Sequence, residues 1–343
     1  MRLFFRRCSL VVIVLLLLPE QWPARAQKQS NADDVIKLGT ELVVLDVDVV
    51  SKKTGHSVDG LKAEDFALYE DGVKQTITHF SQDRLPLSVL ILLDVSGSVW
   101  PTMKTLREGA LDALGNLKPA DEVAVMIFGG RPKLALPFTK DKQLAAQAIQ
   151  TAGPSEVGNN TNTNEAVFQA AAYQKNAANP NNRRIIIAVT DDVSTHKEAM
   201  PHSQLETLHE VLESGSVVCG LFFDSAYKRK IERTYGDPYS GSLGYVLIEG
   251  ATDLVKGYVE RTGGVAIGAD QQNVKEEFIN LIHKLRSRYS LGYVSSNPSR
   301  DAKFRKIKLT LSPEAQRLAG DAGIITRKGY YARKPADSAS KER

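Results

Sequence analysis

The chain has 343 residues, of which 42% are hydrophobic and 24% are charged, a composition typical of ordinary globular proteins. Lysine and arginine exceed aspartate and glutamate by four, but residues 1–26 alone contain four arginines and one glutamate. Without those residues the net charge is about +1. A nearly neutral chain gives no reason to expect a nucleic acid or an anionic membrane as a partner.

The first 26 residues have the pattern of a secretory signal peptide. A basic start is followed by the apolar run 10–18 and by the small residues Ala24 and Ala26, which suit a cleavage site. The apolar run is much shorter than the roughly 20 residues that span a bilayer. We therefore expect cleavage between Ala26 and Gln27, and a secreted or periplasmic protein with no membrane span in the mature chain. An uncleaved membrane anchor is the alternative.

One cysteine, Cys219, remains after the leader is removed. A single thiol cannot form an intramolecular disulfide, even in an oxidising compartment. Because Cys219 lies inside the apolar run 217–223, we expect it to be buried in the core.

The segment after the leader is predicted to be a polar linker, 27–34, followed by an N-terminal β segment, 35–85. The stretch 42–50 is rich in β-branched residues, which favour strands. Two Asp-Gly pairs follow, at 59–60 and 71–72, and such pairs between strand-like runs predict hairpin turns.

Residues 86–287 alternate apolar strands with amphipathic helices. Strands are predicted at 87–93, 122–128, 184–190, 216–223 and 264–267. Apolar residues recur at helical spacing in 103–117, 141–151, 164–176, 202–213, 252–261 and 272–286. This alternation predicts an α/β fold with a doubly wound, mostly parallel sheet flanked by helices. A Gly-, Tyr- and Pro-rich loop, 224–247, interrupts it and is predicted to be either functional or mobile.

Strand patterns return in a C-terminal β segment, 288–333. They cover 289–294, 304–311 and 323–331, and residues 334–343 are predicted to be a disordered tail. Each β segment is small for an independent core. We therefore predict that the two segments pair into one small β-sandwich, with the α/β unit inserted between them.

The stretch Asp94-Val95-Ser96-Gly97-Ser98 directly follows the apolar run 87–93. Ligands of open α/β sheets lie beyond the carboxyl ends of the strands, and alternate residues of an extended loop point the same way. One carboxylate and two hydroxyls are hard oxygen donors that favour Mg²⁺, Ca²⁺ or Mn²⁺ over zinc. For this motif alone, an ordinary helix N-cap is the alternative.

Two later motifs complete a pattern. Thr-Asn-Thr-Asn-Glu-Ala stands at 161–166, and the apolar run 185–189 ends in Thr190-Asp191. With Asp94-x-Ser96-x-Ser98, these motifs resemble the metal-ion-dependent adhesion site of von Willebrand factor A domains. Because all three occur in order, each at a predicted strand end or helix start, the resemblance is specific.

The resemblance implies a role for each matching residue. Ser96 and Ser98 would bind the metal through their hydroxyls, and Thr161 would join them in one conformation. Asp94 and Asp191 would act largely through bound water and neutralise the charge of Mg²⁺, or of Mn²⁺ or Ca²⁺. One coordination position would stay open for an Asp or Glu carboxylate of a partner protein.

Two positions leave alternatives open. Asp192 follows Asp191 where the family usually has glycine, so an extra carboxylate either strengthens cation binding or repels an acidic partner. Thr163 is the alternative to Thr161 as the threonine ligand.

The flanking segments narrow the resemblance. Tyr-Glu-Asp-Gly at 69–72, Tyr-x-Leu-Gly-Tyr at 289–293 and Arg-Lys-Gly-Tyr at 327–330 resemble the secreted von Willebrand A-related proteins abundant in Acidobacteria. We therefore predict an exported, metal-dependent protein-binding module for adhesion or scaffolding. The alternatives are a structural or assembly domain whose metal only rigidifies the loops, and a metal-assisted hydrolase.

Enzyme activity is not expected. The sequence has no Gly-x-Ser-x-Gly elbow, phosphate-binding loop or His-Glu-x-x-His motif. The three motifs also contain no histidine or lysine that could activate Ser96 as a nucleophile. The identity of the partner and the oligomeric state are left open by the sequence.

Overall fold

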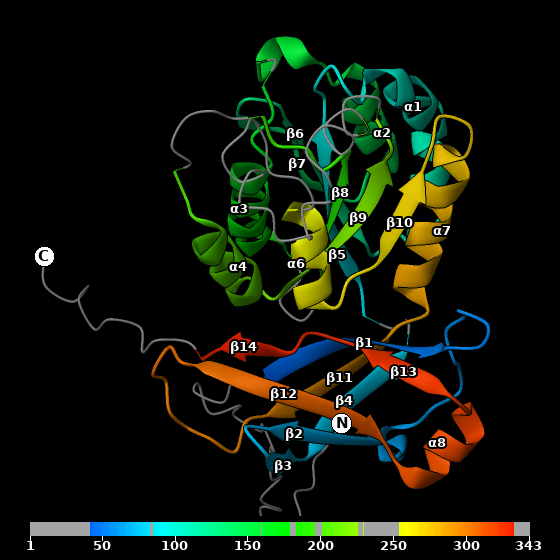
Figure 1. Ribbon diagram of the computed structural model, residues 1–343, viewed down its shortest axis with the longest axis vertical. Helices are drawn as coiled ribbons and strands as arrows, with labels where there is room; N and C mark the ends of the chain where they lie inside the picture. Colours follow the sequence, from blue (N-terminus) through cyan, green and yellow to red (C-terminus); the bar gives the residue numbers. More distant parts are fainter. Residues whose placement is uncertain are drawn as a thin grey trace, which may run out of the picture. The chain divides into compact units, whose positions relative to one another are not determined.

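The computed structural model describes residues 42–82, 85–158, 160–178, 183–195, 201–225, 229 and 254–332. The predicted leader and linker, most of the loop 224–247 and the predicted tail lie outside these ranges. The described residues form a mixed α/β structure with one large, mostly parallel sheet and two smaller sheets (Figure 1). The predicted fold class is confirmed.

Within the described residues, the central sheet has six strands in the order β10-β9-β8-β5-β6-β7. In chain order they are β5 (Leu87–Asp94), β6 (Glu122–Phe128), β7 (Pro132–Thr139), β8 (Arg183–Thr190), β9 (Ser216–Phe223) and β10 (Ala266–Ala269). All neighbours are parallel except β7, which is antiparallel to β6. The five predicted strands are confirmed, although β10 begins two residues later than expected.

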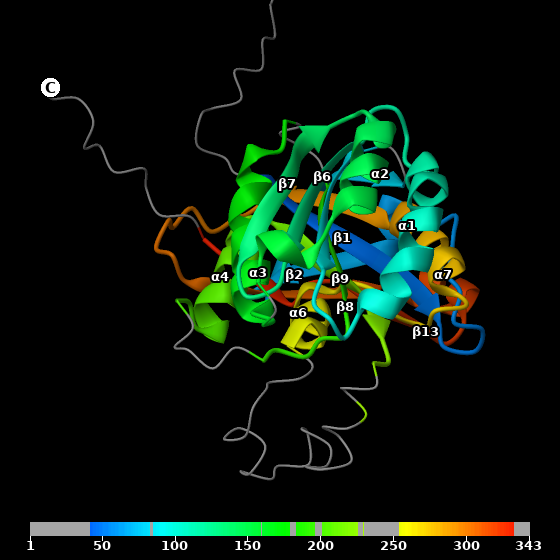
Figure 2. The same cartoon turned by 90° about the horizontal axis from the view of Figure 1, so that it is seen from above.

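Strand β7 was not predicted. It lies at the edge of the sheet, and its side chains alternate between half-buried and exposed over most of its length (Figure 2). Pro132 and Pro137 weaken its strand pattern, because proline lacks the N–H that a central strand needs. At an edge this loss is tolerated, since one side of the strand has no partner strand.

Helices cover both faces of the central sheet. They are α1 (Trp100–Gly115), α2 (Lys142–Thr151), α3 (Thr163–Tyr173), α4 (Gln204–Glu213), α6 (Leu254–Thr262) and α7 (Val274–Arg286). One core layer joins α1, α2 and α7 to the sheet, and the other joins α3, α4 and α6 (Figures 1 and 2). Strand β5 is buried at every position, because its alternate side chains enter the two layers. Its carboxyl end is therefore held rigidly.

The two smaller sheets have the strand orders β13-β1-β11-β4 and β14-β12-β2-β3. The strands are β1 (Leu42–Ser51), β2 (Phe66–Glu70), β3 (Val73–Gln75), β4 (Ile77–Gln82), β11 (Tyr289–Val294), β12 (Phe304–Leu311), β13 (Ala322–Ile325) and β14 (Gly329–Tyr331). Short helices complete the chain: η1 (Ala63–Asp65), η2 (Pro154–Glu156), η3 (Gln174–Asn176) and α8 (Pro313–Ala319).

Both smaller sheets combine strands from the two ends of the described chain. Strand β1 pairs with β11 and β13, and β12 pairs with β2. The two sheets share one apolar core, in which the rings of Phe66, Phe80 and Tyr289 lie 5.7–5.9 Å apart. The prediction that the β segments form one sandwich is confirmed.

The two predicted Asp-Gly turns have different outcomes. Asp71 and Gly72 connect β2 to β3 with φ angles of 47° and 86°, so the predicted hairpin is confirmed. The hairpin predicted at 59–60 is wrong. Strand β1 already ends at Ser51, and residues 59–60 lie in a loop, in which the N–H of Leu61 donates to the hydroxyl of Tyr289 (3.1 Å). No helix of the described residues is long and apolar enough to cross a membrane.

Cys219 lies in β9 and is fully buried, as predicted. Burial raises the pKa of its thiol to about 11. A thiol with so high a pKa stays protonated at neutral pH and is a poor nucleophile.

Candidate metal site

The first predicted loop folds back over the end of β5. Asp94 is fully buried, and its Oδ1 accepts a hydrogen bond from the backbone N–H of Ser96 (2.9 Å). The hydroxyl oxygens of Ser96 and Ser98 lie 3.1 Å apart. Ser96 is buried and Ser98 is partly exposed, so this pair of hydroxyls lies at the boundary between the sheet and solvent.

The third predicted loop is bonded directly to the first. The hydroxyl of Thr190 donates to Asp94 Oδ2 (2.7 Å) and accepts from the backbone N–H of Asp192 (2.9 Å). Asp191 is fully buried, and its Oδ1 accepts from the N–H of Val193 (3.3 Å). Its Oδ2 is buried and finds no hydrogen-bond partner among the described residues. The structure thus places two buried carboxylates together.

The electrostatics of this pair fit a bound cation. Burial raises the pKa of Asp94 to about 7, and the negative charge of Asp191 adds to the increase. A divalent ion would remove this repulsion. It would also give the unpartnered Oδ2 of Asp191 a partner, and an unsatisfied buried acceptor costs about 1–3 kcal/mol.

The second predicted loop is hydrogen-bonded to the third. The N–H of Thr161 donates to the hydroxyl of Thr195 (3.0 Å), and its carbonyl accepts from the N–H of Thr195 (2.9 Å). The hydroxyl of Ser194 donates to the same carbonyl (3.0 Å). All three loops predicted from the sequence are therefore brought together, although they lie far apart along the chain.

The two candidate threonines have different surroundings. Thr161 lies in the loop, whereas Thr163 is the first residue of α3. Asn162 between them caps this helix by accepting from the N–H of Glu165 (3.2 Å). The hydroxyl of Thr163 is buried without a partner. The choice of Thr161 stays a prediction.

Asp192 has a function that its sequence context did not indicate. Its carboxylate accepts from the N–H groups of Val255 (2.9 Å) and Lys256 (3.1 Å), so it caps the first turn of α6. Its φ of 55° lies in the left-handed region, which glycine adopts readily and aspartate tolerates. The cap was missed because α6 lies 63 residues further along the chain.

Two other residues near the site were also missed. Thr190 orients Asp94 as described above, although the sequence analysis treated it only as part of a motif. Asn164 accepts from the hydroxyl of Tyr258 in α6 (2.5 Å) and donates to the carbonyl of His202 (2.7 Å). The polar character of 190 and 164 at a strand end and a helix start is the signal that could have found them.

Comparison with known proteins agrees with this architecture. Residues 89–194 match the family model described as von Willebrand factor type A domain, and this range contains all five predicted metal-binding residues. None of the curated proteins matches this chain.

Several solved structures are similar to parts of the chain. A conserved hypothetical protein, BatB, from Bacteroides thetaiotaomicron is 18% identical, with a TM-score of 0.41 over 58% of this chain and 98% of that one. A von Willebrand factor type A protein from Catenulispora acidiphila is 12% identical, with a TM-score of 0.46 over 80% and 74%. Proximal thread matrix protein 1 from the mussel byssus, in a structure with a zinc-occupied MIDAS motif, is 14% identical, with a TM-score of 0.42 over 59% and 48%.

Proposed function

We propose that this protein is an exported, divalent-metal-dependent protein-binding module that acts in adhesion or as a scaffold. It engages an acidic residue of a partner protein through an ion held at the meeting point of the three loops. The ion is held by Asp94, Ser96, Ser98, Thr161 and Asp191. The observation that carries this proposal is the pair of buried carboxylates, Asp94 and Asp191, with one oxygen of Asp191 left unpartnered.

The donor set supports Mg²⁺, or Mn²⁺ or Ca²⁺, as the ion. Hydroxyl and carboxylate oxygens are hard ligands. Ser96 and Ser98 supply neutral donors, so the two aspartates must balance the charge from within the protein. A bound ion of this kind supplies a strong positive site for one more oxygen ligand, and a carboxylate from a partner meets that need best.

The alternative role, in which the ion only rigidifies the loops, receives less support. The Asp94–Thr190 and Thr161–Thr195 hydrogen bonds connect the loops to one another directly. Catalysis also receives little support, because residues 94–98, 161–163 and 190–195 include no histidine, lysine or cysteine. We therefore propose a binding function and no enzyme activity.

Export is proposed from the leader pattern of the first 26 residues. Membership of the secreted von Willebrand A-related proteins of Acidobacteria is proposed from the flanking motifs. Mass spectrometry of the mature protein in the culture medium or periplasm would test export. An N-terminus at Gln27 is expected, and an intact Met1 would contradict it.

Metal titration tests the site itself. We expect saturable binding of Mg²⁺ or Mn²⁺ to the wild type by isothermal titration calorimetry, and loss of binding in Asp94→Ala. Asp192→Asn is the matched control, because it changes an adjacent acid that caps α6, and it should keep the metal affinity. Equal affinity in the wild type and Asp94→Ala would refute the site. Thr161→Val and Thr163→Val decide between the threonines.

Partner capture tests the function. Immobilised protein would be incubated with native cell-envelope extract in Mg²⁺ or in chelator, with Asp94→Ala as the control. A partner retained only by the wild type in Mg²⁺ is expected. If metal raises the unfolding temperature but no partner depends on it, the structural role is the better description.

A further inference from the structure

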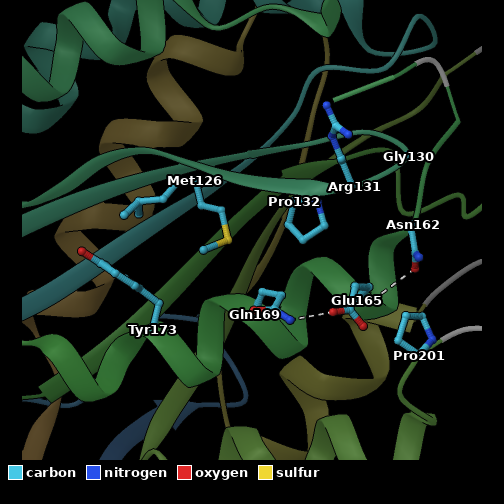
Figure 3. A pocket seen from close by; sticks show the side chains of 10 residues that line it. Met126, Gly130, Arg131, Pro132, Asn162, Glu165, Gln169, Tyr173 and Pro201 are labelled. Atoms are coloured by element: carbon cyan, nitrogen blue, oxygen red, sulfur yellow. Dashed lines mark hydrogen bonds between the residues drawn. The ribbon is translucent and has the colours of Figure 1, made fainter. Parts of the chain in front are cut away.

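A cavity of about 620 Å³ lies between the β6–β7 hairpin and α3 (Figure 3). Its size is in the range of ligand-binding clefts, about 300–1,000 Å³. Part of the wall is apolar or aromatic, from Met126, Leu134 and Tyr173. The other part is polar, from Asn162, Glu165 and Gln169. The cavity is thus suited to a ligand with an apolar stem and a polar end.

The polar wall carries a negative charge, for which the described residues supply no permanent counterion. The Glu165 side chain is 9% exposed and accepts hydrogen bonds from Gln169 Nε2 (2.7 Å) and His202 Nδ1 (2.8 Å). Among the described residues, His202 is the ion-pair partner of Glu165, and it is charged only when it is protonated. Buried charges are normally paired, so a cation next to Glu165 would balance its charge.

The one arginine of the wall does not supply that cation. The guanidinium of Arg131 donates to the carbonyl of Glu156 (3.3 Å), and its side chain points away from Glu165 in Figure 3. Glu165 and Gln169, in contrast, are drawn together at one side of the cavity. The positive charge of Arg131 and the negative charge of Glu165 therefore lie at separate places on the cavity wall.

The wall of the cavity adjoins the candidate metal site. Asn162 lines the cavity and is bonded along the chain to Thr161. The N–H of Asn162 donates to the carbonyl of Gly129 (2.8 Å), which ties the metal loop to the β6–β7 hairpin. A partner segment that reaches the metal loops is thus also near the mouth of this cavity.

We propose that the cavity receives a lysine or arginine side chain, which the partner presents close to the acidic residue that meets the ion. The methylene groups of that side chain would pack against Met126, Leu134 and Tyr173, and its charged end would pair with Glu165. An acidic side chain would be repelled by Glu165, and an apolar one would leave the carboxylate without a counterion. That the same partner fills both places rests on the proposed function, but the preference of the cavity for a cation does not.

The test uses small probes and the full mature chain. ¹⁵N-labelled protein would be titrated with Nα-acetyl-lysine methylamide, with the norleucine analogue and with Nα-acetyl-aspartate methylamide, each with Mg²⁺ and with chelator. The lysine probe should shift the amide signals of Leu134, Glu165 and Gln169 in both conditions. The norleucine probe should bind about tenfold more weakly, because it lacks the charged hydrogen bond.

Variants separate charge from shape. Glu165→Gln should remove the preference for lysine over norleucine, while Glu276→Gln, an exposed acid on α7 at the other face of the sheet, should keep it. Equal binding of the two probes to the wild type, shifts confined to other regions, or no binding of the lysine probe would each overturn the proposal. The aspartate probe reports separately on the metal site, since it should shift residues 94–98 only with Mg²⁺.

Discussion

Buried carboxylates lie at both ends of the central sheet, and their surroundings differ. At the amino ends of the strands, Asp46 of β1 accepts from Arg183 Nε and Nη2 (2.9–3.1 Å), and Asp121 pairs with Arg286. At the carboxyl ends, Asp94 and Asp191 repel one another and accept hydrogen bonds from hydroxyl and N–H groups. The first arrangement balances its charge from within the chain, whereas the described residues supply no cation to the second.

The difference distinguishes carboxylates that pair with arginines of the chain from carboxylates that would need a bound cation to balance their charge. Both kinds of carboxylate lie next to the eight-residue strand β8. Arg183 at its first position pairs with Asp46, and Asp191 follows Thr190 at its last position. At the Arg183 end the protein has supplied a guanidinium for each acid. At the Asp191 end the described residues supply burial and hydrogen-bond donors but no cation, as the proposed metal site requires.

Removing an arginine from the paired carboxylates at the amino ends of the strands should have the largest effect on stability. Arg183→Met leaves Asp46 buried without its bidentate partner, so we expect the free energy of unfolding to fall by roughly 3–5 kcal/mol. Urea denaturation followed by circular dichroism would measure it. The double variant Arg183→Met/Asp46→Asn should recover much of the loss. A fall below about 1 kcal/mol in the single variant would show that this pair is not what balances the charge.

Removing the charge of Asp94 should have the opposite effect and stabilise the folded protein at neutral pH. The pKa of Asp94 is raised from 3.8 to about 7 in the folded protein, so folding favours the protonated acid. Its contribution to stability is complete below pH 3.8 and is lost as the pH rises through about 7. Relative to Asp94→Asn, the wild type in chelator should lose roughly 1.4 kcal/mol per pH unit within this window.

Urea unfolding of both proteins at several pH values would measure this difference. Saturating Mg²⁺ should restore the stability of the wild type at neutral pH and leave Asp94→Asn unchanged. Parallel pH profiles for the two proteins in chelator would contradict the proposed repulsion.

A smaller effect is expected where an acid acts as a helix cap. Asp192→Ala removes both hydrogen bonds to the start of α6, and loss of such a cap to alanine typically costs about 0.5–2 kcal/mol. Thermal unfolding in chelator would measure this loss. If metal affinity fell as steeply as in Asp94→Ala, Asp192 would belong to the metal site after all.

The smallest effect is expected for an ion pair at the surface. Lys52 and Asp321 lie 2.7 Å apart, but their side chains are 63% and 74% exposed. Lys52→Ala should change the free energy of unfolding by less than about 1 kcal/mol, because water and salt screen the pair. A larger loss by urea denaturation would mean that exposure does not separate weak pairs from strong ones in this protein.

Most of the fold could be predicted from the sequence, because its signals are local. The continuous apolar run of β5 reflects burial on both faces of the strand. The helical spacing of apolar residues in α1 reflects burial on one face of the helix. The three loops of the candidate metal site were also predictable, since short motifs mark them. Strand β7 was missed because an edge strand with two prolines has a weak pattern.

Long-range partnerships could not be predicted in the same way. The cap that Asp192 gives to α6 and the pairing of Arg183 with Asp46 join residues 63 and 137 positions apart. A single sequence contains no signal for such pairs, because it does not show which donor an acidic side chain contacts in the folded protein. The same limit applies to Glu165, whose burial beside a cavity depends on how β7 and α3 meet.

The mixed strand order of the sandwich also affects how the chain folds. Strand β1 lies between β11 and β13, so its neighbours are synthesised about 240–280 residues after it. Until then its apolar face, with Val43, Leu45, Val47 and Val49, has no partner strand on either edge. Strand β1 therefore stays without its neighbouring strands until β11 and β13 have been synthesised. That delay prolongs the exposure of its apolar side chains to aggregation.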